Sequence, residues 1–172
     1  MAMRTVIKPT ICRKLKYLRE IMGNLCSFHL YRTKPFDPRC INQITSFGQF
    51  ITVRAKNGNK SYEVTDAAGN TTLHNLTEIE LRNRYYYGLG GLIIGTPTMC
   101  DGEIWVYDWA CPNCDNARYR LDLSRDATGL ATCPHCGIVY DLNIGGIPVK
   151  GKGRTLWKYR YSKFGTEVVI IN

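Results

Sequence analysis

The chain has 172 residues and a mass of 19.6 kDa, which suits one domain with extensions. Its hydrophobic fraction of 44% is sufficient for a packed core, and its 11 Tyr and 16 Gly favour strands joined by tight turns over a helical bundle. No stretch reaches the ~18 apolar residues of a membrane-spanning helix, and no segment has the pattern of an export signal. The sequence alone therefore predicts a cytoplasmic protein without a transmembrane segment.

The net charge of +9 is unevenly distributed along the chain. Residues 1–60 hold 12 Lys and Arg against two acidic residues, whereas residues 61–172 hold 11 against 12. Nucleic-acid binding requires clustered cations, so the nearly neutral second part argues against a nucleic-acid partner. The small cationic group of Lys150, Lys152, Arg154 and Lys158 could belong to a nucleic-acid surface, but a solvated rim explains it equally well.

Residues 1–45 show no clear hydrophobic period, and Pro35 and Pro38 interrupt regular structure there. We expect a basic, weakly ordered N-terminal arm over residues 1–45 and an all-β domain over residues 46–172. The charge of the arm is most simply a solvated surface. Association with a membrane surface or a polyanion is the alternative for the arm.

From Phe50 onward the sequence alternates between apolar and polar residues. Asn57-Gly58 separates two alternating runs and predicts a hairpin, and Thr71–Leu76 predicts a third strand. Thr77 and Glu80 have the spacing of a capping box, which predicts one short helix over Glu78–Tyr86.

The remaining segment is rich in short strands and Gly turns. The Gly-rich stretch 88–95 lacks a P-loop lysine, so it is interpreted as a closely packed start of a strand rather than a phosphate cradle. The fold class predicted by this spacing is mainly β, a small antiparallel barrel or sandwich. The expected strands are Glu103–Trp109, Arg118–Leu123, Gly129–Thr132, Ile138–Leu142, Thr155–Tyr161 and Glu167–Ile171.

Four of the eight cysteines occur in two C-x-x-C pairs, Cys111-Pro-Asn-Cys114 and Cys133-Pro-His-Cys136, separated by eighteen residues. A C-x-x-C turn presents both sulfurs on one side of the backbone, and two such turns, called knuckles, form a tetrahedral four-sulfur site. Gly137 after the last cysteine permits a positive φ. Cys12, Cys26, Cys40 and Cys100 are scattered and are expected to be free thiols or, in an exported protein, partly disulfide-bonded.

We therefore predict that Cys111, Cys114, Cys133 and Cys136 bind one metal ion within a knuckle subdomain over residues 109–142. Thiolates select zinc or iron, and a closed four-cysteine zinc site is structural rather than catalytic. Zinc is the preferred cofactor, with iron or a [2Fe–2S] cluster as the alternative. An unmetallated pair of dithiols and a thioredoxin-like redox role are weaker alternatives, since the redox motif requires a βαβ setting. His135 is expected to face solvent or to donate a hydrogen bond to a ligand.

The sequence from Cys133 onward resembles the second half of a Rieske domain. Gly137 is followed by Tyr140-Asp141-Leu142, then by the Gly146-Ile-Pro148-Val-Lys-Gly151 loop, and Leu156 and Tyr159 fall on the next expected strand. The resemblance covers roughly residues 88–172 and implies a Rieske-like barrel or sandwich. The chain is also similar to Rieske-like envelope proteins of Bacteroidetes, which implies the cell envelope as the alternative location.

The sequence departs from the Rieske pattern at the metal ligands themselves. A Rieske centre uses two histidines on one iron, but Asn113 and Cys136 occupy the two histidine positions here, and Cys114 adds a thiolate. The sequence therefore predicts a Rieske-like binding or scaffold module with a structural site and an unidentified protein partner. An electron carrier is the alternative, and no paired carboxylates, triad or open metal site indicate an enzyme.

Overall fold

The computed structural model describes residues 34–36, 44, 48–83, 85–98, 103–126, 128–164 and 167–171. The chain divides into two units, Met1–Arg32 and Thr33–Asn172, and all described residues belong to the second unit. Cys12, Cys26, Cys40 and Cys100 lie outside the described residues. Within the segment expected to be an arm, Lys34–Phe36 forms a strand that pairs with Glu167–Ile171.

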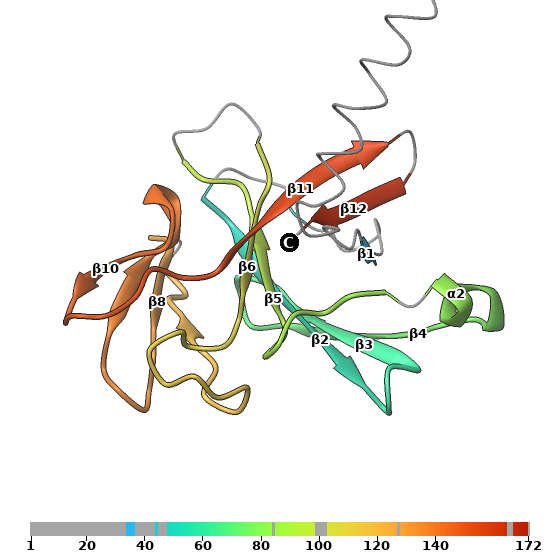
Figure 1. Ribbon diagram of the computed structural model, residues 1–172, viewed down its shortest axis with the longest axis horizontal. Coiled ribbons are helices and arrows are strands. Elements are labelled where there is room, and N and C mark those ends of the chain that lie inside the picture. The colour runs from blue at the N-terminus through green and yellow to red at the C-terminus, as the bar shows by residue number, and fades with distance from the viewer. Residues whose placement is uncertain are drawn as a thin grey trace, which may run out of the picture. The chain divides into compact units, whose positions relative to one another are not determined.

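The described residues form two antiparallel sheets (Figure 1). The larger sheet has the strand order β1-β12-β11-β6-β5-β2-β3-β4, and the smaller has the order β10-β9-β8-β7. The strands are β1 (Lys34–Phe36), β2 (Phe50–Lys56), β3 (Ser61–Thr65), β4 (Thr71–Asn75), β5 (Leu92–Gly95), β6 (Trp105–Asp108), β7 (Asp122–Leu123), β8 (Leu130–Thr132), β9 (Val139–Asp141), β10 (Ile147–Lys150), β11 (Lys158–Phe164) and β12 (Glu167–Ile171).

The prediction of a mainly-β antiparallel fold is confirmed, but the larger sheet remains open instead of closing into a barrel. In the described part of the chain the one α-helix is α2 (Glu78–Asn83), accompanied by the 3-10 turn η2 (Leu142–Ile144). Neither of these helical segments has the length and apolar character needed to cross a bilayer.

The β2–β3 hairpin forms where the Asn-Gly pair predicts it. Lys56 pairs with Ser61, and the connection between them includes three residues with positive φ, Asn57, Gly58 and Asn59. Asparagine and glycine adopt this left-handed conformation more readily than other residues, so the local sequence sets the register of β2 on β3.

The capping box at the start of α2 is also present. The Glu80 backbone N–H donates to Thr77 Oγ1 over 3.4 Å, and the Thr77 N–H donates to Glu80 Oε2 over 2.8 Å. The helix ends at Asn83, before the predicted end at Tyr86. The following tyrosines, Tyr86 and Tyr87, pack instead against the core of the larger sheet.

The central strands β2, β5 and β6 are buried on both faces. Ile51, Leu92 and Val106 belong to one hydrophobic cluster on the larger sheet. Their neighbours Phe50, Ile93 and Tyr107 belong to a second cluster, because successive side chains of a strand point to opposite faces.

The second cluster joins the two sheets and includes the candidate metal site. It combines Tyr107 of the larger sheet with Ala131 and Tyr140 of the smaller one, together with Cys111 and Cys133. The buried Tyr107 hydroxyl donates to the Leu142 carbonyl over 2.8 Å, which provides a polar connection across the same interface. The packing that joins the sheets therefore also positions the cysteines.

Candidate metal centre

The first knuckle, Cys111–Cys114, follows β6 after Trp109 and Ala110. The Cys111 N–H donates to the Tyr119 carbonyl over 2.8 Å, and the Asp115 N–H donates to the Cys111 carbonyl over 3.2 Å, so the chain turns back on itself. Asp115 has a φ of 49°, the left-handed conformation that closes the turn. The N–H groups of Asn113 and Cys114 donate to the Cys111 sulfur.

The second knuckle, Cys133–Cys136, connects β8 to β9 and repeats this geometry. The Gly137 N–H donates to the Cys133 carbonyl over 2.9 Å, and the Cys133 N–H donates to the Ile138 carbonyl over 2.9 Å. Gly137 has a φ of 73°, which confirms the conformation predicted for it. The N–H groups of His135 and Cys136 donate to the Cys133 sulfur.

The structure brings the four predicted cysteine sulfurs together as free thiols. All four Sγ atoms lie within 4.8 Å of one another. The two separations of 3.7 Å, Cys111 to Cys136 and Cys114 to Cys133, each join one knuckle to the other. Cys111 and Cys133 are buried, whereas Cys114 and Cys136 are partly exposed. The group could hold one metal ion that joins the two knuckles.

The electrostatics of the group favour a bound cation. Burial raises the pKa of Cys111, but hydrogen bonds from the Tyr140 hydroxyl and two backbone N–H groups outweigh it, and the pKa falls to about 7. Burial and the neighbouring thiols raise the pKa of Cys114, and burial also raises the pKa of Cys133. One thiolate therefore forms readily, but further thiolates in this space require a positive ion to compensate their repulsion.

The sequence analysis did not identify Tyr140 as part of the site. Its buried hydroxyl lies 3.5 Å from Cys111 Sγ and donates to this sulfur when it is a thiolate. Burial raises the pKa of Tyr140, with the Cys111 contact as a further cause, so the phenol stays protonated and able to donate. Alternation within β9 does not indicate this role, because Tyr140 lies between the apolar Val139 and the polar Asp141.

We predict that Tyr140→Phe weakens metal binding about tenfold, the effect typical of hydrogen bonds to metal ligands. Removing the donor raises the pKa of Cys111, so the metal should leave at a higher pH during acidification than in the wild type. Competition with a chromophoric chelator across pH measures both quantities. The matched control is Tyr107→Phe, which removes a buried hydroxyl that contacts a carbonyl instead of a sulfur. Equal metal affinity in the two variants would contradict this role for Tyr140.

His135 lies outside the four-sulfur group but beside it. Its Nδ1 atom is 3.4 Å from Cys114 Sγ, and its exposed ring stacks on Tyr119 with a centroid separation of 3.8 Å. This position agrees with the expectation that His135 faces solvent or donates to a ligand. His74, by contrast, stacks on Tyr62 away from the cysteines.

Asp108 anchors the backbone around the first knuckle, and the sequence analysis missed it. The buried carboxylate accepts hydrogen bonds from the N–H groups of Leu89, Gly90 and Ala110. It also accepts a 2.6 Å bond from the Tyr159 hydroxyl. The N–H groups of Leu89 and Gly90 in the Gly-rich stretch therefore bind a carboxylate of the protein itself, in agreement with the expectation that this stretch is not a phosphate cradle.

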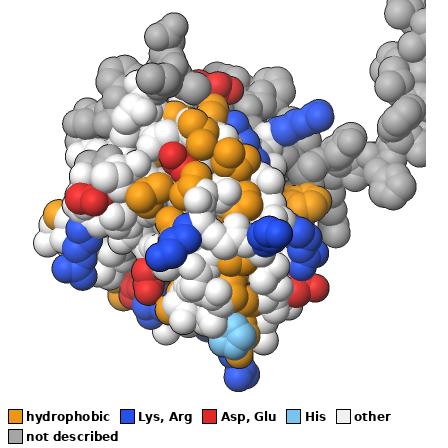
Figure 2. Space-filling model, turned by 90° about the vertical axis from the view of Figure 1, so that its left-hand side faces the viewer, with side chains coloured by type: hydrophobic (Ala, Val, Ile, Leu, Met, Phe, Trp, Pro, Cys, Tyr) orange, Lys and Arg blue, Asp and Glu red, His pale blue; other side chains and the backbone are white. Residues whose placement is uncertain are grey.

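The cationic group of Lys150, Lys152, Arg154 and Lys158 extends from the last residue of β10 to the first residue of β11. Lys150, Lys152 and Arg154 are exposed, while Lys158 lies over the Trp105 ring at 3.3 Å from its centroid. Figure 2 views the molecule from the side of the smaller sheet and shows Lys and Arg side chains separated by hydrophobic and neutral ones. The expectation that this face does not bind nucleic acid stays a prediction.

Comparisons with protein-family models, curated proteins and solved structures found no match for this chain. The fold and the site by themselves define a mainly-β protein with four clustered cysteines that could bind a metal ion. The Rieske resemblance and the likeness to envelope proteins stay predictions from the sequence.

Proposed function

We propose that this protein is a non-enzymatic metal module in which one zinc ion at Cys111, Cys114, Cys133 and Cys136 has a structural role. The observation that carries the proposal is the approach of all four sulfurs to within 4.8 Å. The zinc would fasten the smaller sheet to the larger one. The module would act as a binding or scaffold domain for a protein partner.

The sulfur separations support a single ion. A tetrahedral ion with metal–sulfur bonds of about 2.3 Å has sulfur–sulfur edges of about 3.8 Å, close to the two separations of 3.7 Å. A two-iron cluster distributes its cysteines over two irons and needs a wider arrangement of sulfurs. Four thiolates leave zinc no open position for a substrate, which supports a structural role over a catalytic one.

An electron-transfer protein with iron at the same four cysteines is the second candidate. The observation that favours it is the partial exposure of Cys114 and Cys136, since electron transfer requires the centre to approach a partner. With four anionic sulfurs and no imidazole ligand, an iron centre here should have a lower reduction potential than a Rieske centre. The potential should also be independent of pH above neutrality.

The Rieske-like scaffold is part of the proposal. Two knuckles that approach each other at one end of a four-stranded sheet support it, as does the Gly146–Gly151 segment, which here forms β10 against β9. We propose that the scaffold is retained while the histidine-ligated cluster is replaced by a four-cysteine site.

Elemental analysis and visible absorption of the freshly purified full chain test the proposal. We expect one zinc ion per chain, no colour and no voltammetric wave. One iron with thiolate-to-iron absorption and a wave would replace the first candidate by the second. Two irons with two inorganic sulfides would support a cluster and contradict the single-ion geometry. A chain without metal after purification and zinc titration would overturn both candidates.

A further inference from the structure

A cavity of about 320 Å³ opens beside the first knuckle. Its walls come from three parts of the chain that are distant in sequence: the segment around Tyr86, the first knuckle, and the segment 154–159 before and within β11. Its size lies at the lower end of the range for small-molecule sites, roughly 300–1,000 Å³. Cys111 is the one cysteine of the four-sulfur group that lines the cavity.

One end of the cavity is rigid and fully hydrogen-bonded. Asp108 and Tyr159 form it, and both are buried, with exposures of 5% and 4%. Asp108 accepts hydrogen bonds from the N–H groups of Leu89 and Ala110 and from the Tyr159 hydroxyl. The Tyr159 hydroxyl also lies 3.0 Å from the hydroxyl of Tyr86. Several residues that line the cavity are therefore fixed before any ligand arrives, which lowers the entropic cost of binding.

The lining of the cavity includes an exposed aromatic ring, that of Trp157, which contrasts with the other two tryptophans of the chain. Trp105 and Trp109 each donate their indole N–H to an acceptor and each lie beneath a cation. Trp157 has neither partner among the described residues, and it is 61% exposed. Its backbone is nevertheless held, because its carbonyl accepts a 2.9 Å hydrogen bond from the Asp108 N–H.

Apolar groups line the cavity together with the Trp157 ring and enlarge its hydrophobic surface. Leu89, which is 64% exposed, Pro112 and the ring of Tyr86 line the same cavity as Trp157. A concave surface with exposed aromatic and aliphatic groups favours a flat apolar ligand, because burying the ligand also removes these groups from water.

Two opposite charges accompany the aromatic walls. Arg154 and Asp115 are exposed, line the cavity, and have no side-chain hydrogen bond or ion pair within the described segments. Asp115 lies next to the ligand Cys114 on the first knuckle, and Arg154 lies in the opposing segment. A ligand with an amine and a carboxylate on one end would satisfy both charges.

We propose that this cavity binds a small aromatic molecule carrying both an amine and a carboxylate, the chemistry of an aromatic amino acid. The ring stacks against Trp157 between Leu89 and Pro112. The carboxylate pairs with Arg154, and the amine pairs with Asp115. The proposal is independent of which metal the cysteines hold.

Nuclear magnetic resonance titration of the full chain, as purified, tests the proposal with three probes. L-phenylalanine carries both charges, 3-phenylpropionate lacks the amine, and phenethylamine lacks the carboxylate. We expect L-phenylalanine to bind more tightly than either analogue and to shift the indole N–H signal of Trp157. The indole signals of Trp105 and Trp109 should move little, since both N–H groups are already hydrogen-bonded.

Single variants then separate the three contacts. Trp157→Ala should weaken L-phenylalanine binding about tenfold, from the loss of aromatic contact. Arg154→Gln should weaken L-phenylalanine and 3-phenylpropionate about fivefold and leave phenethylamine unchanged. Asp115→Asn should instead weaken L-phenylalanine and phenethylamine and leave 3-phenylpropionate unchanged. Asparagine tolerates the positive φ at this position.

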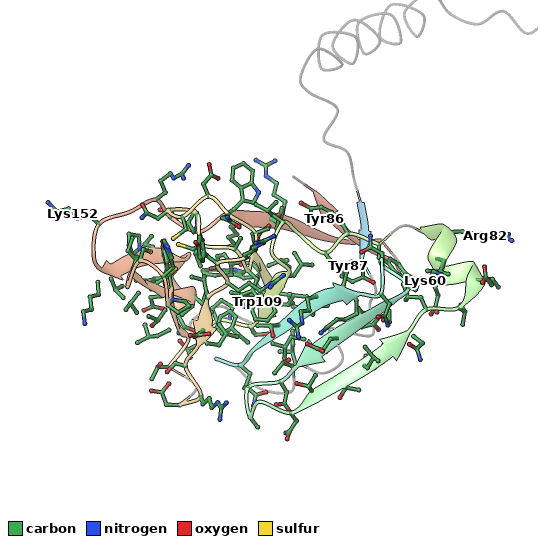
Figure 3. The ribbon with its side chains drawn as sticks, turned by 90° about the horizontal axis from the view of Figure 1, so that it is seen from below. Lys60, Arg82, Tyr86, Tyr87, Trp109 and Lys152 are labelled. Carbon is green, nitrogen blue, oxygen red and sulfur yellow. The ribbon has the colours of Figure 1, made fainter. Side chains whose placement is uncertain are left out.

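Matched controls come from exposed residues that do not line the cavity. Val149→Ala removes an exposed apolar side chain, and Lys152→Gln removes a cation whose side chain extends away from the body of the protein (Figure 3). Both should bind L-phenylalanine within twofold of the wild type. Absence of L-phenylalanine binding would overturn the proposal. Binding that Trp157→Ala, Arg154→Gln and Asp115→Asn all leave unchanged would also overturn it.

Discussion

Replacing any one of Cys111, Cys114, Cys133 or Cys136 by serine is expected to abolish stoichiometric metal binding. A serine hydroxyl remains protonated near neutral pH and cannot replace a thiolate in a four-sulfur site. Because all four sulfurs lie within 4.8 Å of one another, the remaining three thiols would be left crowded without a compensating ion. We expect the metal content to fall from one ion per chain to well below half.

The same substitutions should destabilise the protein, because metal binding at such a site is part of the free energy of folding. Cys111 and Cys133 are buried in the cluster that joins the two sheets, so loss of the metal loosens this interface. We expect a loss of about 3 kcal/mol or more in the free energy of unfolding. The smaller sheet should lose hydrogen-exchange protection first, because the other cluster consists of residues of the larger sheet and of Tyr87.

Serine substitutions at Cys12, Cys26, Cys40 and Cys100 provide the controls for this prediction. These cysteines lie outside the two C-x-x-C pairs and should leave the metal content unchanged. Inductively coupled plasma mass spectrometry of each variant, with urea unfolding, gives both readouts. If two of the scattered cysteines proved essential for metal, the assigned ligand set would be wrong.

The parts of the fold that were predicted from the sequence depend on local patterns. Asn57-Gly58 fixed the β2–β3 hairpin and Thr77 with Glu80 fixed the start of α2, since each signal acts within a few residues. The four cysteines could be identified for the same reason, because their spacing within each knuckle is local. The pairing of one knuckle with the other was an inference from the chemistry of metal sites.

The parts that were missed depend on tertiary contacts. β5 follows Gly88, Gly90 and Gly91 and was predicted only as the start of a strand, because a four-residue strand buried on both faces shows no alternation. β10 lies in a Gly-x-Pro-x-x-Gly segment that was interpreted as a loop, yet it pairs with β9 around a register shift. β10 has no local signal that distinguishes it from a turn-rich connection, and the short apolar run of β5 does not by itself distinguish a strand from another buried segment.

Asp108 is the clearest functional residue that sequence reasoning could not find. Its carboxylate accepts hydrogen bonds from the N–H groups of Leu89 and Gly90, nineteen and eighteen residues earlier in the chain. It also accepts one from the hydroxyl of Tyr159, fifty-one residues later. In sequence it is one aspartate at the end of a short strand, and nothing there shows that its carboxylate is buried. Its role follows only from the arrangement of the strands around it.

Asp108→Ala is therefore expected to have the second large effect on this protein. The substitution leaves three N–H groups without their acceptor, the buried ones of Gly90 and Ala110 and the partly buried one of Leu89. A buried donor left without a partner costs about 1–3 kcal/mol, so the total loss should be about 3–5 kcal/mol. The Tyr159 hydroxyl is affected less, because it retains the hydroxyl of Tyr86 at 3.0 Å.

Urea unfolding of Asp108→Ala measures this loss, and Asp122→Ala is the matched control. Asp122 is an exposed carboxylate in β7, so its removal should change stability by no more than about 0.5 kcal/mol. Metal affinity should fall in Asp108→Ala as well, since Ala110 immediately precedes Cys111 and its N–H is one of the groups that Asp108 holds. Equal unfolding midpoints and metal affinities for the two variants would show that the Asp108 carboxylate does not stabilise the loop or position the first knuckle.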